Sequence, residues 1–248
     1  LAGLCRVWRR LRCFMVSLAN IFLVNSAMAL LAVCCIWAAP ETVSKPARPK
    51  LTIQRLSVPP EVRGVFIPAA IAGFASFAMC GFFTSIAPAM MGKVLGYDNR
   101  LLIGVVAGSI FIASTLGQFL QGALPLRLRL PLGCVSLMLG VIPIAMGIYT
   151  QSLALFITGA VIAGMGQGIS FRAGMGAIAS ASPIAEKAAV TSAFFVVAYI
   201  AISVPVIGLG VMATVTSLTT TGISFAAVMG SLAALALVLL IRRERVEA

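Results

Sequence analysis

Five stretches of this chain run for at least 26 residues without a charged side chain. The hydrocarbon core of a bilayer is about 30 Å thick, so a helix needs roughly 20 apolar residues to cross it. Each stretch is long enough for at least one such span. They cover residues 13–40, 64–92, 101–126, 130–171 and 188–241. Runs of this length predict a chain embedded in a membrane.

The two longest stretches each contain a polar turn, at residues 149–152 and 214–217, and so each holds two spans. Barrel strands would alternate apolar and polar residues over about ten positions, whereas these runs are continuous and rich in Gly and Ala. We therefore expect an all-α integral membrane protein. The seven predicted helices lie at residues 14–38, 65–92, 101–126, 130–149, 153–182, 187–213 and 218–241.

The composition excludes the main alternatives. Only 10% of the residues are charged, against about 25% in soluble domains, and 61% are hydrophobic, far too many for a disordered chain. The net charge of +12 does not indicate nucleic-acid binding, because no basic face is interleaved with aromatic residues. Basic residues gather instead in loops that stay in the cytoplasm.

Catalytic groups are scarce. The chain has no histidine, and its six acidic residues lie in loops or at the ends of spans, whereas chemistry inside a membrane needs titratable groups at depth. The six cysteines show no metal-type C-x-x-C spacing and are expected to pack as small hydrophobic residues. We predict that the protein is not an enzyme and uses no metal or cofactor; a membrane-embedded enzyme is the least favoured alternative.

The loops predict an orientation. Residues 41–63 contain five basic residues and four prolines and should form an extended polar linker. Around the last six helices, eleven Lys and Arg residues lie on one side and two on the other. The basic side is expected to be cytoplasmic. The helices would then begin and end in the cytoplasm, with the tail 242–248 there too, in the plasma (cytoplasmic or inner) membrane.

The beginning of the chain conflicts with this orientation. Its four arginines would lie outside, although they favour the cytoplasm; they are Arg6, Arg9, Arg10 and Arg12. Three explanations stay open: the stub is an internal loop of a longer protein, it is a signal sequence, or the first segment does not cross fully. A start at Leu1 favours a fragment.

Several motifs add a family resemblance. The first span ends in Pro40-Glu41-Thr42, ahead of the basic linker, and residues 164–168, 183–187 and 194–210 are similar to helices ten and eleven of bacterial carriers. The whole pattern resembles helices six to twelve of a major facilitator superfamily (MFS) carrier. The resemblance divides the chain into a stub with the first helix (1–39), a linker (40–63), a six-helix bundle forming the C-terminal half (64–241) and a tail (242–248).

The loop after the third span is similar to the family motif G-x-L-x-D-R-x-G-R. Gly122, Leu124 and Arg127 match it, whereas Leu126 stands at the acidic position and Arg129 at the second glycine position. The resemblance implies a cytoplasmic loop that takes part in conformational change. A short turn with basic anchors is the alternative.

The resemblance also implies a function. Such carriers have two six-helix halves that hold a small solute between them near the midplane and rock to expose it to either side. This chain supplies one half and one further helix, so we expect a transporter, with efflux as one direction of movement. Its partners would be the solute, the lipid bilayer and a missing N-terminal half or a second copy. The alternative is a truncated remnant that only assembles with other membrane proteins.

Polar residues within spans are the candidates for the solute cavity. Gln118 and Gln121 lie three residues apart and should share a helix face. Gln167 and Arg172 lie five residues apart, or about 140° and about 7 Å along the helix, and should not. Alternatively, Arg172 extends its charge to the interface and the glutamines link helices. The remaining candidates are aromatic, although aromatic residues in spans mostly pack; they are Phe83 and Tyr199.

Two patterns of small residues predict close helix packing. They are Gly104-x-x-x-Gly108 and Ala160-x-x-x-Gly164. Small residues at this spacing let two helix backbones approach each other in a membrane.

Overall fold

The computed structural model describes residues 2–40 and 56–247, without the side chains of 2–18, 244, 246 and 247. The chain divides into two units, residues Leu1–Ile53 and Gln54–Ala248, which are described separately. Glu41, Thr42, the linker up to residue 55 and the side chains of the basic stub lie outside this description. The first unit contains one helix, α1 (Ala2–Ala38), whose segment Ala19–Ala38 is long and apolar enough to span a membrane.

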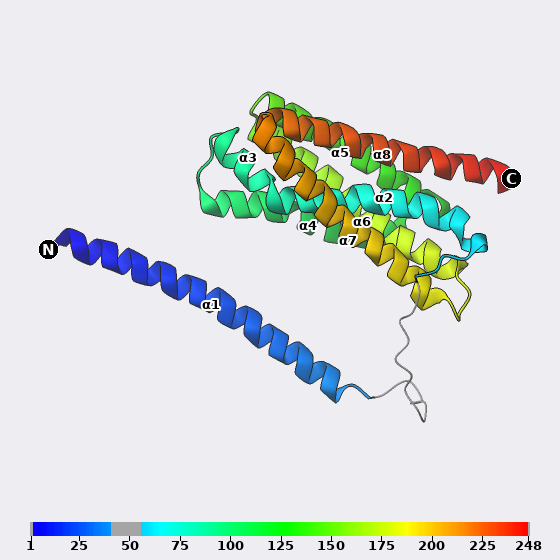
Figure 1. Cartoon of the computed structure of the whole chain (residues 1–248), viewed down its shortest axis with the longest axis horizontal. Helices are drawn as coiled ribbons and strands as arrows, with labels where there is room; N and C mark the ends of the chain where they lie inside the picture. Colours follow the sequence, from blue (N-terminus) through cyan, green and yellow to red (C-terminus); the bar gives the residue numbers. More distant parts are fainter. Residues whose placement is uncertain (1, 41–55, 248) are drawn as a thin grey trace. The chain divides into compact units, whose positions relative to one another are not determined.

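The second unit is a bundle of long helices (Figure 1). Together with α1, it gives the described residues seven candidate spans and no strand, which confirms the all-α membrane fold. Its elements are α2 (Pro60–Ser85), α3 (Ala87–Lys93), α4 (Arg100–Leu120), the 3-10 turn η1 (Gln121–Ala123), α5 (Leu126–Tyr149), α6 (Leu153–Ala181), α7 (Lys187–Val215) and α8 (Leu218–Glu247).

Two helices begin earlier than the uncharged runs predicted. α2 begins at Pro60, so the last residues of the predicted linker are helical, and α5 begins at Leu126 and includes Arg127 and Arg129. Proline fits the first helical position because it has no N–H to leave unpaired, and Pro60 occupies that position in α2. Charged side chains end an apolar run in the sequence, but they do not end a helix.

The second predicted span is interrupted. α2 ends at Ser85 and α3 begins at Ala87, where the sequence predicted one helix over 65–92. Pro88 has no N–H to donate to the carbonyl of Thr84, and its ring disfavours a straight helix. The side chains of Thr84 and Ser85 turn back at the break, and each donates a hydrogen bond to the carbonyl of Gly81, at 3.1 and 2.6 Å.

Helix α6 packs closely between α4 and α5 because glycines lie on two of its faces. A Cβ at Gly164 would lie 2.6 Å from the carbonyl oxygen of Ile110 on α4, and one at Gly166 would lie 2.7 Å from the amide nitrogen of Leu137 on α5. Ser136 Oγ on α5 also donates a 2.8 Å hydrogen bond to the carbonyl of Ile162. These contacts fix α6 at the centre of the bundle, between α4 and α5.

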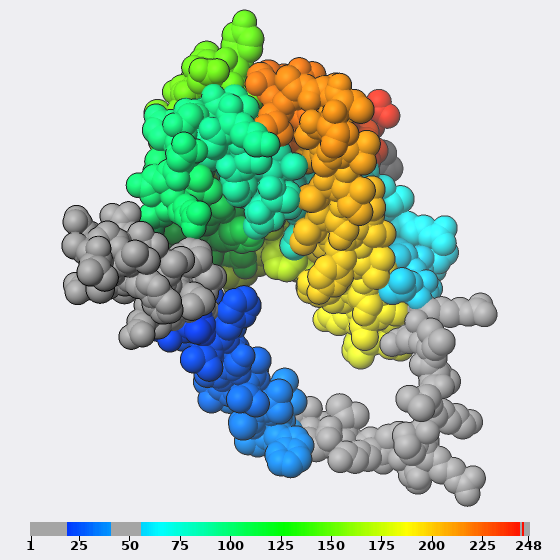
Figure 2. Space-filling view, turned by 60° about the vertical axis from the view of Figure 1, so that its left-hand side comes forward, coloured from blue at the N-terminus to red at the C-terminus, as the bar shows by residue number. Residues whose placement is uncertain are grey.

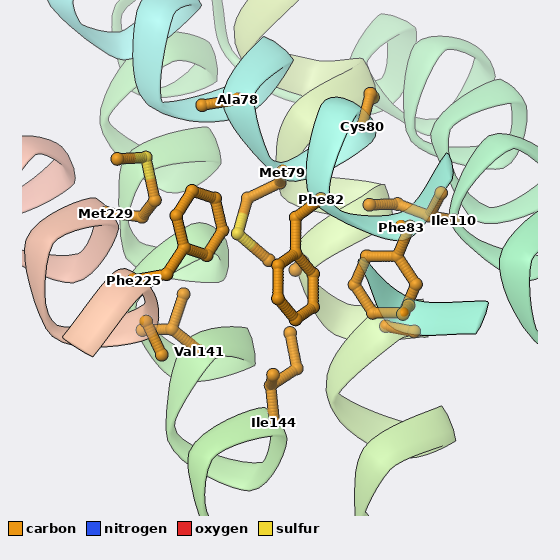
Figure 3. Close-up of a cluster of buried hydrophobic side chains, with 14 of the residues drawn as sticks. Ala78, Met79, Cys80, Phe82, Phe83, Ile110, Val141, Ile144, Phe225 and Met229 are labelled. Atoms are coloured by element: carbon orange, nitrogen blue, oxygen red, sulfur yellow. The ribbon is translucent and has the colours of Figure 1, made fainter. Parts of the chain in front are cut away.

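A core of aromatic and sulfur-containing side chains joins α2 to the neighbouring helices (Figure 3). The ring of Phe82 stacks on that of Phe225 from α8, with centroids 4.9 Å apart. The ring of Phe83 lies 5.3 Å from that of Phe156 on α6. All four rings are at least 95% buried, so this core holds one face of α2 in a fixed position.

Candidate functional site

A cavity of about 400 Å³ lies between α2, α4, α6 and α7. Figure 2 views the bundle from the side where α4 (green) and α7 (yellow to orange) are both visible. The cavity is lined by Phe77, Cys80, Gly81, Thr84, Phe111, Ser114, Gln118, Gln167, Phe171, Phe195, Ala198, Tyr199 and Ile202. None of these side chains is charged.

The lining residues follow helical spacing on each element. Phe111, Ser114 and Gln118 lie at steps of three and four along α4. The α7 lining residues show the same steps; they are Phe195, Ala198, Tyr199 and Ile202. Residues so spaced lie on one face of a helix. Each helix therefore presents one continuous face to the cavity.

Aromatic rings form much of the wall. Phe171 of α6 lies at their centre, with its ring centroid 5.2 Å from that of Phe77 on α2 in an edge-to-face arrangement. Its centroid lies 6.4 Å from that of Phe195 on α7, which is itself 6.5 Å from the ring of Tyr199. Such a wall favours flat apolar molecules, which can stack on or pack edge-to-face against the rings.

Gln167 is a buried polar residue in the wall of the cavity. Its side chain is 4% exposed, and its Oε1 has no hydrogen-bond partner among the described residues. Two other polar groups of the wall are already engaged: Gln118 Nε2 donates to Ser114 Oγ at 3.4 Å, and Thr84 Oγ1 donates to the carbonyl of Cys80 at 3.0 Å. A buried acceptor without a donor costs about 1–3 kcal/mol, so a ligand that donates to Gln167 would recover part of that cost.

Three of the six candidate residues line this cavity: Gln118, Gln167 and Tyr199. Phe83 does not, because its ring faces Phe156 in the aromatic core. Gln121 does not either: α4 ends at Leu120, and Gln121 lies buried in η1 with its own Oε1 unpartnered. The tighter 3-10 turn removes the shared face that was predicted for Gln118 and Gln121.

Arg172 also lies outside the lining of the cavity. Its side chain is exposed, and its Nη1 donates a 3.1 Å hydrogen bond to the backbone carbonyl of Gln118. The last four carbonyls of a helix lack a full set of intrahelical donors, and Gln118 is among the last four residues of α4. Arg172 therefore acts as a cap that ties the end of α4 to α6.

In the predicted loop motif, the side chain of Arg129 binds two main-chain carbonyl groups. Arg129 Nε donates to the carbonyl of Leu124 at 3.0 Å, and Arg129 Nη2 donates to the carbonyl of Gly122 at 3.5 Å. Arg129 thus clamps the turn between α4 and α5. Arg127 is exposed at the start of α5. The observed contacts fit the basic anchor that was the alternative interpretation of this loop.

Most of the aromatic residues that line the cavity were not among the candidates selected from the sequence. Phe77 and Thr84, or Phe111 and Gln118, lie seven residues apart and would have marked a common face. An amphipathic helix shows its inner face by contrast with a polar outer face, but these helices are apolar all round. The repeat therefore does not stand out from the surrounding residues.

Comparison with known proteins places the chain in a family. No curated protein matches it. The family model described as Major Facilitator Superfamily matches residues 14–206, which is most of the chain and includes α2 to α6, the part of α7 that lines the cavity and the apolar segment of α1. With seven apolar helices of spanning length, the chain belongs to the Major Facilitator Superfamily, whose members are multi-pass membrane transporters and not enzymes.

Proposed function

We propose that this chain is part of a carrier for a small, uncharged, aromatic solute. The cavity between α2, α4, α6 and α7 would form part of the pathway that the solute takes. The observation that carries the proposal is the pairing of an uncharged aromatic wall with one buried acceptor that has no partner among the described residues, Gln167 Oε1. Rings of the solute would pack against Phe171 and its neighbours. An N–H or O–H group of the solute would donate to Gln167.

Movement by alternating access needs a second helical unit across the cavity. Gly104 and Gly108 of α4 support such a contact, because a Cβ at either would meet no atom within 4 Å in the described part of the chain. Gly208 and Gly210 of α7 leave similar open space. We propose that a separate N-terminal half, or a second copy inserted in the same orientation, approaches through these faces.

The direction follows from the chemistry of the solute. An uncharged lipophilic molecule enters a cell through the bilayer without help, so a carrier changes its level mainly by moving it outward. We therefore propose efflux across the plasma membrane. The basic loops and the C-terminal tail would lie in the cytoplasm, in agreement with the distribution of Lys and Arg.

Ligand binding tests the cavity. N-phenyl-1-naphthylamine is a neutral, fluorescent aromatic probe with one N–H donor, and its N-methyl derivative lacks that donor. We expect the substitution Gln167→Leu in the purified full chain to weaken binding of the first probe by about 2- to 12-fold, the equivalent of one hydrogen bond. Binding of the N-methyl probe should stay unchanged.

Thr158→Val is the matched control, because it removes an exposed hydroxyl from the same helix, α6, outside the cavity lining. Equal affinities of wild type and Gln167→Leu for the donor probe would contradict the proposal. Movement of the probe into proteoliposomes that contain only this chain then separates a working carrier from an inert remnant. A chain that binds the probe but does not move it fits the need for a second unit, and one that does neither fits the remnant.

A further inference from the structure

A second cavity lies at the end of the bundle where α5 begins and the apolar part of α8 ends. Its volume is about 1150 Å³, and its walls come from α2, α5, α6 and α8. Two arginines line it: Arg127, the second residue of α5, and Arg243, the last residue of the candidate span Leu218–Arg243. Folding thus brings together two cations that are more than a hundred residues apart in the chain.

The rest of the wall is apolar. It includes Val65 of α2, Ala177 of α6 and Leu240 of α8, and no acidic side chain is among its described lining residues. Leu126, beside Arg127, is 78% exposed, as expected for a side chain that faces lipid. The cavity therefore combines cationic groups with apolar walls at the level where spans end and headgroups begin.

Arg127 is available for a ligand in a way that the neighbouring Arg129 is not. Arg129 is held by the carbonyls of Gly122 and Leu124. Arg127 has no hydrogen-bond or ion-pair partner within the described part of the chain. It also lies in the first turn of α5, where Pro125 supplies no side-chain cap, so the positive end of the helix dipole adds to its charge.

We propose that this cavity binds an anionic phospholipid, with the phosphate between Arg127 and Arg243 and the acyl chains along the apolar walls. Arginine pairs well with phosphate through charge-assisted hydrogen bonds. Basic pockets between transmembrane helices at the bilayer surface bind anionic headgroups. A free anion could pair with Arg127 but would leave the large apolar wall unfilled, and this favours a lipid as the occupant.

Native mass spectrometry of the purified full chain tests the proposal, with phosphatidylglycerol as the anionic probe and phosphatidylcholine as the zwitterionic one. We expect wild type to retain phosphatidylglycerol in preference. R127Q and R243Q should each weaken that binding by about fivefold, and the double variant by about 25-fold, from the attraction of each basic residue to an anionic surface. R242Q is the matched control, because Arg242 is the exposed neighbour of Arg243 and does not line the cavity.

Further variants and a competition with inorganic phosphate distinguish a bound lipid from a free anion. R127K/R243K keeps both charges and should keep most of the preference. The single variants leave one charge in place, so the test does not depend on the double variant being folded. Three results would overturn the proposal: no preference in wild type, an equal loss in R242Q and R243Q, or displacement of phosphatidylglycerol by inorganic phosphate but not by chloride at the same ionic strength.

Discussion

The sequence and the structure give the side chain of Arg172 different roles. The sequence makes Arg172 a candidate for the solute cavity, with extension of its charge to the interface as the alternative. The structure shows a 3.1 Å bond to the carbonyl of Gln118 at the end of α4 and a position outside the cavity lining. A cation near the negative end of a helix stabilises that end. The two roles differ in what the substitution Arg172→Ala changes.

We predict that Arg172→Ala lowers the stability of the full chain by about 1 kcal/mol, the typical worth of one hydrogen bond. Affinity for N-phenyl-1-naphthylamine should change little, since Arg172 does not line the cavity proposed for that probe. Thermal unfolding in detergent measures the first quantity, and probe titration measures the second. Arg172→Lys keeps the charge and should recover part of the stability. An unchanged unfolding temperature would contradict the capping role.

The rule that polar residues in spans are informative selected the candidates from the sequence, and two of them, Gln118 and Gln167, lie in the lining of one cavity. Gln121 and Arg172 lie outside that lining, and their positions depend on where α4 ends. α4 ends in a 3-10 turn, and no proline or charge in the sequence marks that end before Pro125. A continuous apolar run thus predicts that a helix exists better than it predicts its last turn.

At the level of the helices, two patterns with the same spacing of small residues have different surroundings. Gly164 lies against the backbone of α4, as predicted for Ala160-x-x-x-Gly164. At Gly104 and Gly108, a Cβ would meet no atom of the described residues within 4 Å. The sequence predicted close packing for both patterns, because the spacing says that a helix can be approached and not which helix approaches it.

We therefore predict opposite effects for two identical substitutions. Gly164→Ala should lower the stability of the chain by about 1–3 kcal/mol, because the new methyl group would overlap Ile110 and force α4 and α6 apart. Gly104→Ala should be neutral or stabilise α4 by about 0.5–1 kcal/mol, because alanine favours the helix. Chemical unfolding of the two variants side by side measures the difference. Similar losses in both would mean that the face of α4 at Gly104 is also packed.

The break between α2 and α3 shows a second limit on predicting helices. Both Pro68 and Pro88 lie in the predicted span 65–92, and α2 continues through Pro68 but ends before Pro88. The sequence predicts where a proline weakens a helix. Pro68 lies buried inside α2, whereas Pro88 lies in the first turn of α3, where its missing N–H leaves no intrahelical bond unmade.

For the whole molecule, the sequence predicted the fold class and the number of spans correctly, because each span must satisfy its own backbone in lipid and so forms a helix of set length. The arrangement of the helices around α6 was beyond the sequence. It depends on which glycine faces which neighbour, as Gly164 and Gly166 show by contacting different helices. The cavity exists only once that arrangement is in place.

The orientation of the bundle gives a prediction for the molecule as a whole. α6 has 29 residues and is about 43 Å long at 1.5 Å per residue, so both its ends leave a hydrocarbon core about 30 Å thick. Thr150 precedes α6, Ala185 follows it, and both residues are exposed. If the basic loops are cytoplasmic, Thr150 faces outward and Ala185 inward.

The measurement uses single cysteines in a chain freed of its native ones, which are Cys5, Cys13, Cys34, Cys35, Cys80 and Cys134. In intact cells, a membrane-impermeant maleimide should label Thr150→Cys. It should label Ala185→Cys only after the cells are permeabilised, and the permeabilised sample also shows that both sites react. The reverse pattern would invert the proposed orientation. Labelling of both sites in intact cells would mean that copies insert both ways, and a second copy in the same orientation could then not be the regular partner across the cavity.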